Sequence, residues 1–238
     1  MRIAYFDSFS GICGDMILGA LVDAGMEIEK LKKELEKLRL TGWRIKKKRI
    51  KKGPISATRI EVVTKEEERT RRLRGIVSLI EKSALEDKVK VLSAAIFFNL
   101  ARAEAKVHGT SIDEVHFYEV GAMDAIIDIV GAMVGIEELK IERIYSSPLP
   151  LGKGFIRCRH GILPLPAPAT LELLKNIPVY EKGVKEELVT PTGAAIISTL
   201  ASSFGRMPKM RIERIGYGAG GRHLTNPNLL RLIVGESY

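Results

Sequence analysis

The chain has 238 residues, of which 45% are hydrophobic and 28% are charged. This balance excludes a disordered chain and a membrane bundle, and folding at this length buries roughly 70% of the surface that the unfolded chain exposes. Lys and Arg exceed Asp and Glu by 38 to 29, which gives a net charge of +9. That charge favours anionic partners but does not identify them. It is the only feature of the sequence that supports nucleic-acid binding.

The two cysteines, Cys13 and Cys158, lie far apart and form neither a disulfide framework nor a CxxC metal knuckle. A reducing compartment follows most simply from this. The N-terminus has no long apolar signal segment, and Asp124 and Asp128 interrupt the most apolar later stretch. We therefore expect a cytoplasmic protein that does not enter a membrane.

Hydrophobic periodicity predicts strands and helices along the whole chain. The predicted strands cover residues 2–6, 44–52, 58–63, 114–120, 141–145, 210–215 and 229–234. The predicted helices start at residue 16 and then cover 27–40, 71–82, 87–107, 122–139, 168–175 and 191–203. Together they predict an α/β fold with a mixed sheet and packed helices, in one intertwined globular unit over residues 1–238. The turn at 109–113 is the alternative place for an internal boundary.

Three segments need separate interpretation. The basic run 44–52 pairs with 58–63 in a predicted hairpin and is best read as a solvated edge strand. Residues 146–168 are crowded with Pro and Gly, so they predict ordered loop and short strands, which in a compact domain are usually functional. Residues 216–221 match GxGxxG, but no helix follows as dinucleotide binding requires, so we predict a flexible turn.

The stretch between residues 104 and 128 concentrates groups that bind metals. It holds His108 and His116, two of the four histidines, and several carboxylates. Asp124 and Asp128 are four residues apart, so a helix places both on one face. Imidazoles and carboxylates bind borderline divalent ions such as nickel or zinc without a closed thiolate cage. The alternative is a solvated helix face beside two surface or capping histidines.

The loop of residues 7–15 precedes a helix, and its small residues present backbone N–H groups to an anion. The anion-binding candidates are Ser10, Gly11 and Gly14. Asp7 and Asp15 flank the loop and are suited to a metal-bound phosphate. Cys13, in front of a helix N-terminus, is predicted to have a depressed pKa and to act as a thiolate or soft ligand. The alternative is a tight turn around a buried cysteine.

Two further segments are candidates for binding acidic ligands. Arg157, Cys158, Arg159 and His160 combine guanidinium, thiol and imidazole groups that suit an acidic ligand or a metal. The alternative is a strand end with the cysteine inward and the arginines in water. Residues 190–193 resemble an N-cap with Pro at the first helical position, where Thr190 and Thr192 lie beside amides that bind phosphate or carboxylate. Most such caps only start a helix.

Five blocks, taken together and in this order, resemble the LarC family. They are residues 7–16, 107–131, 146–170, 190–194 and 216–220, and the resemblance spans residues 1 to about 235. The family inserts nickel into pyridinium-3,5-bisthiocarboxylic acid mononucleotide, with CTP consumed, to complete the nickel-pincer cofactor of lactate racemase and related enzymes. The resemblance therefore implies a nickel chelatase of the lyase class.

Residue roles follow from the resemblance as hypotheses. Nickel or nucleotide-metal handling is implied for Asp7, Cys13, Asp15, His108, His116, Asp124, Asp128 and His160. The phosphate and carboxylates of the substrate are expected to bind Arg157, Arg159 or a helix N-terminus such as the one at Thr190 and Thr192. Removal of the ring proton requires a base, for which His116 and Glu119 are the candidates.

The chain departs from the family pattern in several places. Residues 66–72 replace a histidine-rich tract, Tyr118 stands where His is common, and Cys13 stands where Ser is common. Family chains continue past a segment like 228–234 into a part associated with nucleotide binding. We therefore expect this chain to be the N-terminal part of a nickel-inserting enzyme. For turnover with CTP and its divalent metal it needs a second domain or a second subunit. The rival interpretation is a subunit that carries nickel or the cofactor precursor and catalyses nothing. A homo-oligomer is also possible from the sequence.

Overall fold

The computed structural model describes residues 1–65, 71–117, 123–158, 161–222 and 224–238. The helices are α1 (Gly14–Asp23), α2 (Ile28–Glu36), α3 (Leu73–Glu81), α4 (Asp87–His108), η1 (Ile112–Glu114), α5 (Met123–Glu138), α6 (Pro168–Leu173) and α7 (Pro191–Leu200). The strands are β1 (Arg2–Asp7), β2 (Trp43–Lys52), β3 (Ile55–Thr64), β4 (Arg71–Arg72), β5 (His116–Phe117), β6 (Arg143–Ser146), β7 (Leu149–Leu151), β8 (Gly154–Cys158), β9 (Gly161–Leu165), β10 (Val179–Glu181), β11 (Ala201–Phe204), β12 (Met210–Ala219) and β13 (Leu229–Ser237).

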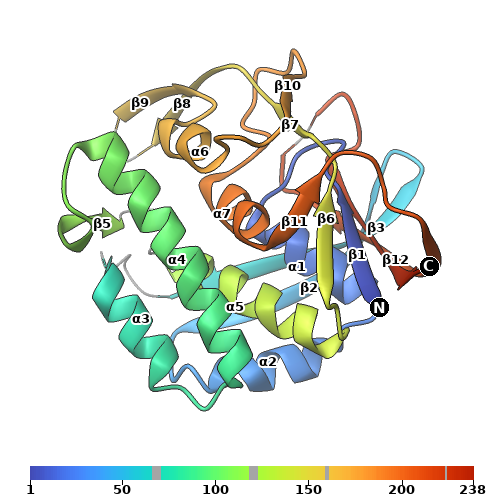
Figure 1. Cartoon of the computed structure of the whole chain (residues 1–238), viewed down its shortest axis with the longest axis horizontal. Helices are drawn as coiled ribbons and strands as arrows, with labels where there is room; N and C mark the ends of the chain where they lie inside the picture. Colours follow the sequence, from blue (N-terminus) through green and yellow to red (C-terminus); the bar gives the residue numbers. More distant parts are fainter. Residues whose placement is uncertain (66–70, 118–122, 159–160, 223) are drawn as a thin grey trace.

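A seven-stranded mixed sheet organises the chain, with the strand order β11-β6-β1-β13-β12-β3-β2 (Figure 1). The first strand lies inside the sheet, because β1 pairs parallel with β6 and antiparallel with β13. At one edge, β2 pairs antiparallel with β3 from Trp43 opposite Thr64 to Lys52 opposite Ile55. The predicted hairpin and the predicted edge strand over 44–52 are both confirmed.

The helices pack in successive layers beside the sheet (Figure 1). Helix α1 lies against β12 and β3, α5 packs on α1, and α4 packs on α5 and α7. Leu18 and Leu21 of α1 and Ile126 and Val130 of α5 are fully buried. Burying each such side chain contributes about 1.5–3 kcal/mol. The α/β class with packed helices is therefore confirmed.

Strand β12 runs through the glycines that the sequence predicted to form a flexible turn. A Cβ at Gly218 would lie 1.8 Å from the Met16 carbonyl oxygen, and one at Gly216 would lie 2.1 Å from that of Ala20. Both glycines thus let α1 rest directly on the strand, as glycine in a strand often does where backbones approach closely. The prediction of a turn at Gly216 and Gly218 is wrong because these residues are packing positions.

Other boundaries shift where tertiary contacts decide them. The helix predicted over 191–203 ends at Leu200, and β11 follows and pairs parallel with β6. The segment 146–168 contains β7, β8 and β9, as predicted for short strands. Of the strand predicted over 114–120, residues 118–120 lie outside the described part. Within that part, no helix combines the length and apolarity needed to cross a membrane.

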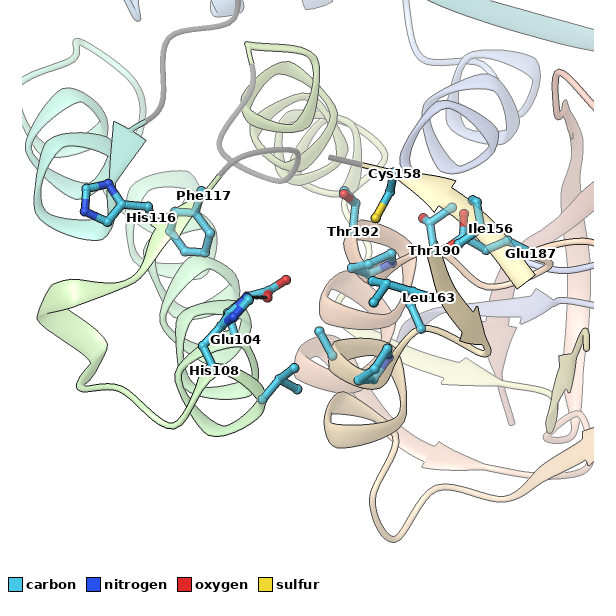
Figure 2. A pocket seen from close by; sticks show the side chains of 15 residues that line it. Glu104, His108, His116, Phe117, Ile156, Cys158, Leu163, Glu187, Thr190 and Thr192 are labelled. Carbon is cyan, nitrogen blue, oxygen red and sulfur yellow. Dashed lines mark ion pairs between the residues drawn. The ribbon is translucent and has the colours of Figure 1, made fainter. Parts of the chain in front are cut away.

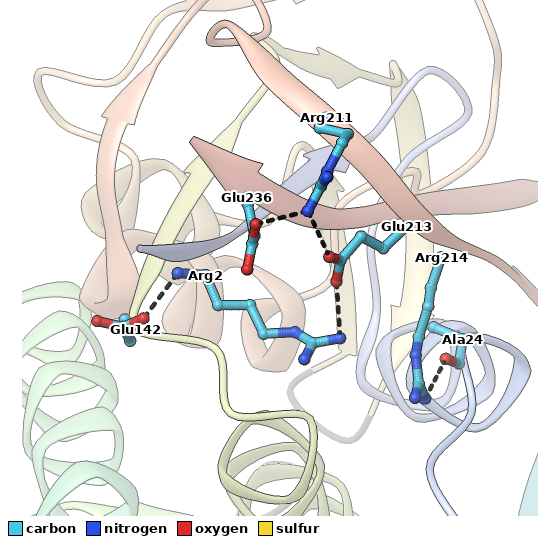
Figure 3. Close-up of polar contacts among 7 residues, drawn as sticks. All are labelled: Arg2, Ala24, Glu142, Arg211, Glu213, Arg214 and Glu236. Atoms are coloured by element: carbon cyan, nitrogen blue, oxygen red, sulfur yellow. Dashed lines mark hydrogen bonds and ion pairs between the residues drawn. The ribbon is translucent and has the colours of Figure 1, made fainter. Parts of the chain in front are cut away.

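Ion pairs join the strands near the two chain ends (Figure 3). Arg211 pairs with Glu236 at 2.8 Å and with Glu213 at 3.7 Å, and Arg2 pairs with Glu213 at 3.2 Å. The main-chain N–H of Arg2 donates to Glu142 Oε1 at 2.6 Å. Such solvent-accessible pairs contribute below about 1 kcal/mol each. They align the strand ends more than they stabilise the fold.

Candidate functional site

The loop that leads into α1 is hydrogen-bonded to the segment that precedes α7. Ile12 N–H donates to the Leu188 carbonyl at 2.9 Å, and Thr190 N–H donates to the Ile12 carbonyl at 3.2 Å. Gly11 has φ +111°, and a Cβ there would lie 2.1 Å from the Leu188 carbonyl oxygen. This pairing places the first residues of α1 beside those of α7.

Two glycines let three helices converge. A Cβ at Gly14, the first residue of α1, would lie 2.3 Å from Asp128 Oδ2 on α5. A Cβ at Gly193, in the first turn of α7, would lie 2.4 Å from the Ile12 carbonyl oxygen. The N-terminal turns of α1, α5 and α7 therefore meet at one place. Helix N-termini favour negative charge because their N–H groups and dipoles point there.

A cavity of about 350 Å³ lies at this meeting point, and we call it the acidic cavity. The carboxyl groups of Asp15, Asp124 and Asp128 and the thiol of Cys13 line it. The rest of its wall is formed by Gly14, Arg59, Ile60, Glu61, Val62, Thr190 and Thr192. The two aspartates that the helical spacing placed on one face thus share a cavity with the start of α1.

The acidic side chains of this cavity differ in how fully their hydrogen-bonding capacity is met. Cys13 Sγ donates to Asp15 Oδ1 at 2.7 Å. Burial, together with the charges of Asp15 and Asp124, raises the pKa of Asp128 well above its ordinary value. In the described ranges the buried Oδ1 of Asp128 accepts no hydrogen bond. Leaving such an atom without a partner is costly, so a cation in the acidic cavity would be stabilised there.

The state of Cys13 corrects a prediction made from its position. A helix N-terminus favours a thiolate. Here burial, followed by the charge of Asp15 and its hydrogen bond, raises the pKa of the Cys13 thiol well above its ordinary value. The predicted depressed pKa is therefore wrong for the chain alone. A divalent cation in the same cavity would reverse the local field and favour the thiolate.

A second cavity of about 250 Å³ adjoins the first, and we call it the histidine cavity (Figure 2). Thr190 and Thr192 line both cavities, so the two are neighbours across the start of α7. Its polar lining includes His108, His116 and Glu104. The remaining lining is Val107, Phe117, Ile156, Cys158, Leu163, Ala167, Pro168, Ala169, Glu187 and Pro191.

The two histidines of this cavity have different surroundings. His108 Nε2 lies 3.5 Å from Oε2 of Glu104, one turn earlier on α4, and the Glu104 side chain is only 13% exposed. His116 is exposed, and Figure 2 shows its ring turned away from Cys158. Arg72 Nη2 lies 3.3 Å from His116 Nε2. A guanidinium only donates, so this imidazole nitrogen accepts.

The structure brings many of the predicted site residues to these two cavities. They are Cys13, Gly14, Asp15, His108, His116, Asp124, Asp128, Thr190 and Thr192. The predictions for Glu119, Arg159 and His160 fall outside the described residues. Among the residues that the structure does describe, no group of three or more His, Cys, Asp and Glu side chains is arranged to hold a metal ion. A metal ion bound here would therefore complete its coordination with water or with donor atoms of the substrate.

Three residues of the opening loop that were predicted to bind ligands lie outside the two cavities. Asp7 accepts a hydrogen bond from Arg231 Nε at 3.0 Å, between β1 and β13. Ser10 is buried, and the N–H of Gly11 donates to the Ser8 carbonyl at 2.9 Å. Asp7, Ser10 and Gly11 line neither cavity.

Arg157 also lies outside the two cavities. Strand β8 alternates, so that Ile156 and Cys158 line the histidine cavity while the Arg157 side chain is exposed. For Arg157 the structure agrees with the alternative weighed for this segment, a side chain in water, whereas Cys158 is half-buried and lines the cavity, and Arg159 lies outside the described residues. No disulfide joins Cys13 and Cys158.

Sequence reasoning missed several cavity residues. Glu104 precedes His108 by four residues, a helical spacing that was available as a signal. Arg59 and Glu61 alternate in a predicted strand, but nothing in the sequence shows which helix starts that strand would face. Glu187 lies in a loop with no distinguishing pattern.

Comparisons with known proteins find similar sequences over almost the whole chain. A family model described as "Nickel insertion protein" matches residues 4–238. A putative nickel insertion protein of Dictyoglomus thermophilum is 49% identical over 99% of this chain and 61% of its own length. Pyridinium-3,5-bisthiocarboxylic acid mononucleotide nickel insertion proteins of Desulfitobacterium hafniense and Geobacillus kaustophilus are 52% and 46% identical, over 99% of this chain and 59% and 60% of their own lengths. No solved structure matches.

Proposed function

This chain belongs to the nickel insertion protein family, and on that premise we propose that it inserts nickel into pyridinium-3,5-bisthiocarboxylic acid mononucleotide to form the nickel-pincer cofactor. The substrate is the one in the names of its relatives. The chain spans about three fifths of the length of those relatives. The observation that carries the proposal is the buried Oδ1 of Asp128, which lies in the cavity with Cys13 and Asp15 and accepts no hydrogen bond from any residue that the structure describes.

We propose that the acidic cavity receives the nickel ion as a substrate. Asp15, Asp124 and Asp128 offer hard oxygen donors, and Cys13 adds one soft donor. Nickel is of borderline character, so the two thiocarboxylate sulfurs of the mononucleotide compete well against carboxylate oxygens. Transfer from oxygen to sulfur ligands is then favourable, and a site of incomplete donors releases its ion more readily than a closed cage.

We propose that the pyridinium ring occupies the histidine cavity, whose apolar wall includes Phe117, Ile156 and Leu163. Formation of a bond between nickel and the ring carbon requires that carbon to lose its proton. His108 is suited to accept the proton, because Glu104 at 3.5 Å stabilises the resulting imidazolium. The alternatives to His108 are His116 and Glu119, the bases predicted from the sequence. Substituting each of the three in turn and measuring product formation compares them.

We further propose that insertion consumes CTP with a divalent metal, and that this step uses the part of the relatives' length that this chain does not span. The part is either a second domain or a separate subunit. The chain is then a lyase-class nickel chelatase whose turnover depends on that part. The rival candidate is a carrier that binds nickel and the mononucleotide without catalysis.

A reconstitution assay tests the proposed function. The chain is mixed with nickel, the bisthiocarboxylate mononucleotide and CTP, with and without the remaining part of a relative, and the nickelated product is quantified by mass spectrometry. We expect product only with the added part, and its loss in Asp128→Asn. The matched control is Asp87→Asn, whose side chain is 97% exposed on α4. Nickel binding without product or CTP consumption in either mixture would support the carrier instead.

A further inference from the structure

A third cavity, of about 560 Å³, lies between the β2–β3 hairpin and the loop that follows β12. We call it the basic cavity, because four cationic side chains line it together with one carboxylate. They are Lys48, Lys51, Lys52, Arg59 and Glu61. The rest of the lining is Ile50, Gly53, Gly221, Leu224, Thr225, Asn226, Pro227 and Asn228.

The cations of the basic cavity are held close together. Lys48 Nζ and Arg59 Nε each lie 3.0 Å from an oxygen of the same carboxylate, Glu61. Lys52 Nζ donates to the Arg222 carbonyl at 3.0 Å, and burial together with the charge of Arg59 lowers the pKa of Lys52. Like charges gathered in this way oppose one another, and an anion between them relieves that repulsion.

The loop over this cavity is built to approach the cations. A Cβ at Gly221 would lie 3.0 Å from Arg59 Nη2, and one at Gly220 would lie 2.6 Å from Asn228 Nδ2. Asn228 is buried and donates from Nδ2 to the Arg222 carbonyl at 3.2 Å. Gly220 therefore lets the loop pack on Asn228, and at Gly221 a side chain would displace the end of Arg59.

The basic cavity continues the site already described. Arg59 and Glu61 line it and also line the acidic cavity. One end of this continuous site therefore suits a divalent cation, and the other end suits an anion. A nucleotide that carries a metal-binding group and a phosphate at its two ends has the same distribution of charge.

We propose that the basic cavity binds the phosphate group of a nucleotide whose other end reaches the acidic and histidine cavities. The inference rests on the proposed function, and it assigns the phosphate to Lys48, Lys52 and Arg59 in place of Arg157 or the start of α7. Lysine ammonium groups bind phosphate as point charges, and a guanidinium adds paired hydrogen bonds. The mononucleotide substrate carries such a phosphate, and CTP, which also carries phosphate, is the competing ligand that the test includes.

Binding measurements on the whole chain test this assignment. Titration calorimetry compares nicotinic acid mononucleotide, a pyridinium monocarboxylate, with nicotinic acid riboside, which lacks only the phosphate. We expect the mononucleotide to bind at least about tenfold more tightly, since a charged hydrogen bond is worth that factor or more. In Lys52→Gln and Lys48→Gln we expect the mononucleotide to lose about tenfold in affinity and the riboside to lose nothing. Lys47→Gln, an exposed lysine of β2 outside the cavity, is the control for net charge.

A parallel titration with CTP separates the two sources of phosphate. A tenfold loss for the mononucleotide alone in Lys52→Gln assigns the site to the substrate. A loss for CTP alone would overturn the proposal, because CTP has no metal-binding group at the end opposite its phosphates. Equal affinities for mononucleotide and riboside, with CTP binding unchanged by Lys52→Gln, would overturn the proposal. Phosphate-dependent binding without any nickelated product in reconstitution would contradict the proposed function and leave this site intact.

Discussion

Gly14 and Asp128 are so close that a side chain on the first would displace the second: a Cβ at residue 14 would lie 2.3 Å from Oδ2 and 2.6 Å from Cβ of Asp128. The first residue of α1 and the second turn of α5 thus come within contact distance only because residue 14 is glycine. The same contact positions the Asp128 carboxyl against the start of α1. Packing and site geometry therefore depend on one position.

The first prediction concerns this contact. Gly14→Ala should destabilise the fold by about 1–3 kcal/mol, because overpacking a close contact forces the neighbours apart. It should also weaken nickel binding, since the Asp128 carboxyl moves. Chemical denaturation and calorimetry with nickel measure the two effects.

A matched glycine provides the control. Gly75 lies in α3, and a Cβ there meets no atom within 4 Å. Gly75→Ala should stabilise the protein by about 0.5–1 kcal/mol through helix propensity and leave nickel binding unchanged. Equal effects of the two substitutions would show that the contact with Asp128 has no special role.

The second prediction follows from the raised pKa of Asp128. A carboxyl with a raised pKa in the folded state opposes folding once it must ionise. This penalty is absent below the ordinary aspartate pKa of about 3.9, increases as the pH rises toward the raised value, and is constant above it. Asp128→Asn removes this ionisation penalty and should therefore raise the melting temperature near pH 8. The expected rise is about 2–4 °C for each ~1 kcal/mol by which the free energy of unfolding increases. The gain should shrink toward zero near pH 4, and a gain independent of pH would contradict the ionisation argument.

The third prediction concerns the Cys13 thiol. Asp15 accepts its hydrogen bond and contributes to its raised pKa. Asp15→Asn should lower that pKa and speed alkylation of Cys13 by iodoacetamide near pH 8, because the thiolate is the reactive form. The measurement is the rate of modification at Cys13 by mass spectrometry, in a Cys158→Ser background. A slower rate in Asp15→Asn would show that the carboxylate promotes the thiolate.

The fourth prediction separates Asp7 from the acidic cavity. Asp7 is bonded to Arg231, with the Nε contact at 3.0 Å, and its side chain is 17% exposed. Asp7→Asn should cost about 1–3 kcal/mol of stability, because the guanidinium loses a charged partner. Nickel affinity should be unchanged when it is measured well below the melting temperature. A loss of affinity that matches Asp128→Asn would restore Asp7 to the metal-binding set.

The sequence was most informative where one face of an element is continuously apolar. The helix predicted over 122–139 is observed at Met123–Glu138, since its burial is nearly complete. The end of α7 was missed because Ala201–Phe204 contains no Gly or Pro that would end a helix, and only pairing with β6 makes those residues a strand. The glycines at 216 and 218 were misread because their reason is a helix that packs on them from far along the chain.

The site was predictable in part for the same reason. The four-residue spacing of Asp124 and Asp128 correctly placed both on one helix face, and both line the acidic cavity. Arg59 could not be assigned, because its place between two cavities depends on the register of β3 against β2 and on the loop after β12. Local spacing determines which residues share an element, whereas the contacts between elements determine which cavity they line.

Equilibrium binding of nickel to the purified chain tests the central claim most directly. We predict that the wild type binds nickel in the acidic cavity, that Asp128→Asn lowers the affinity at least about tenfold, the cost of one charged interaction, and that Asp87→Asn does not change it. Nickel binding of the same affinity in wild type and Asp128→Asn would contradict the claim that the cavity between α1, α5 and α7 receives the metal.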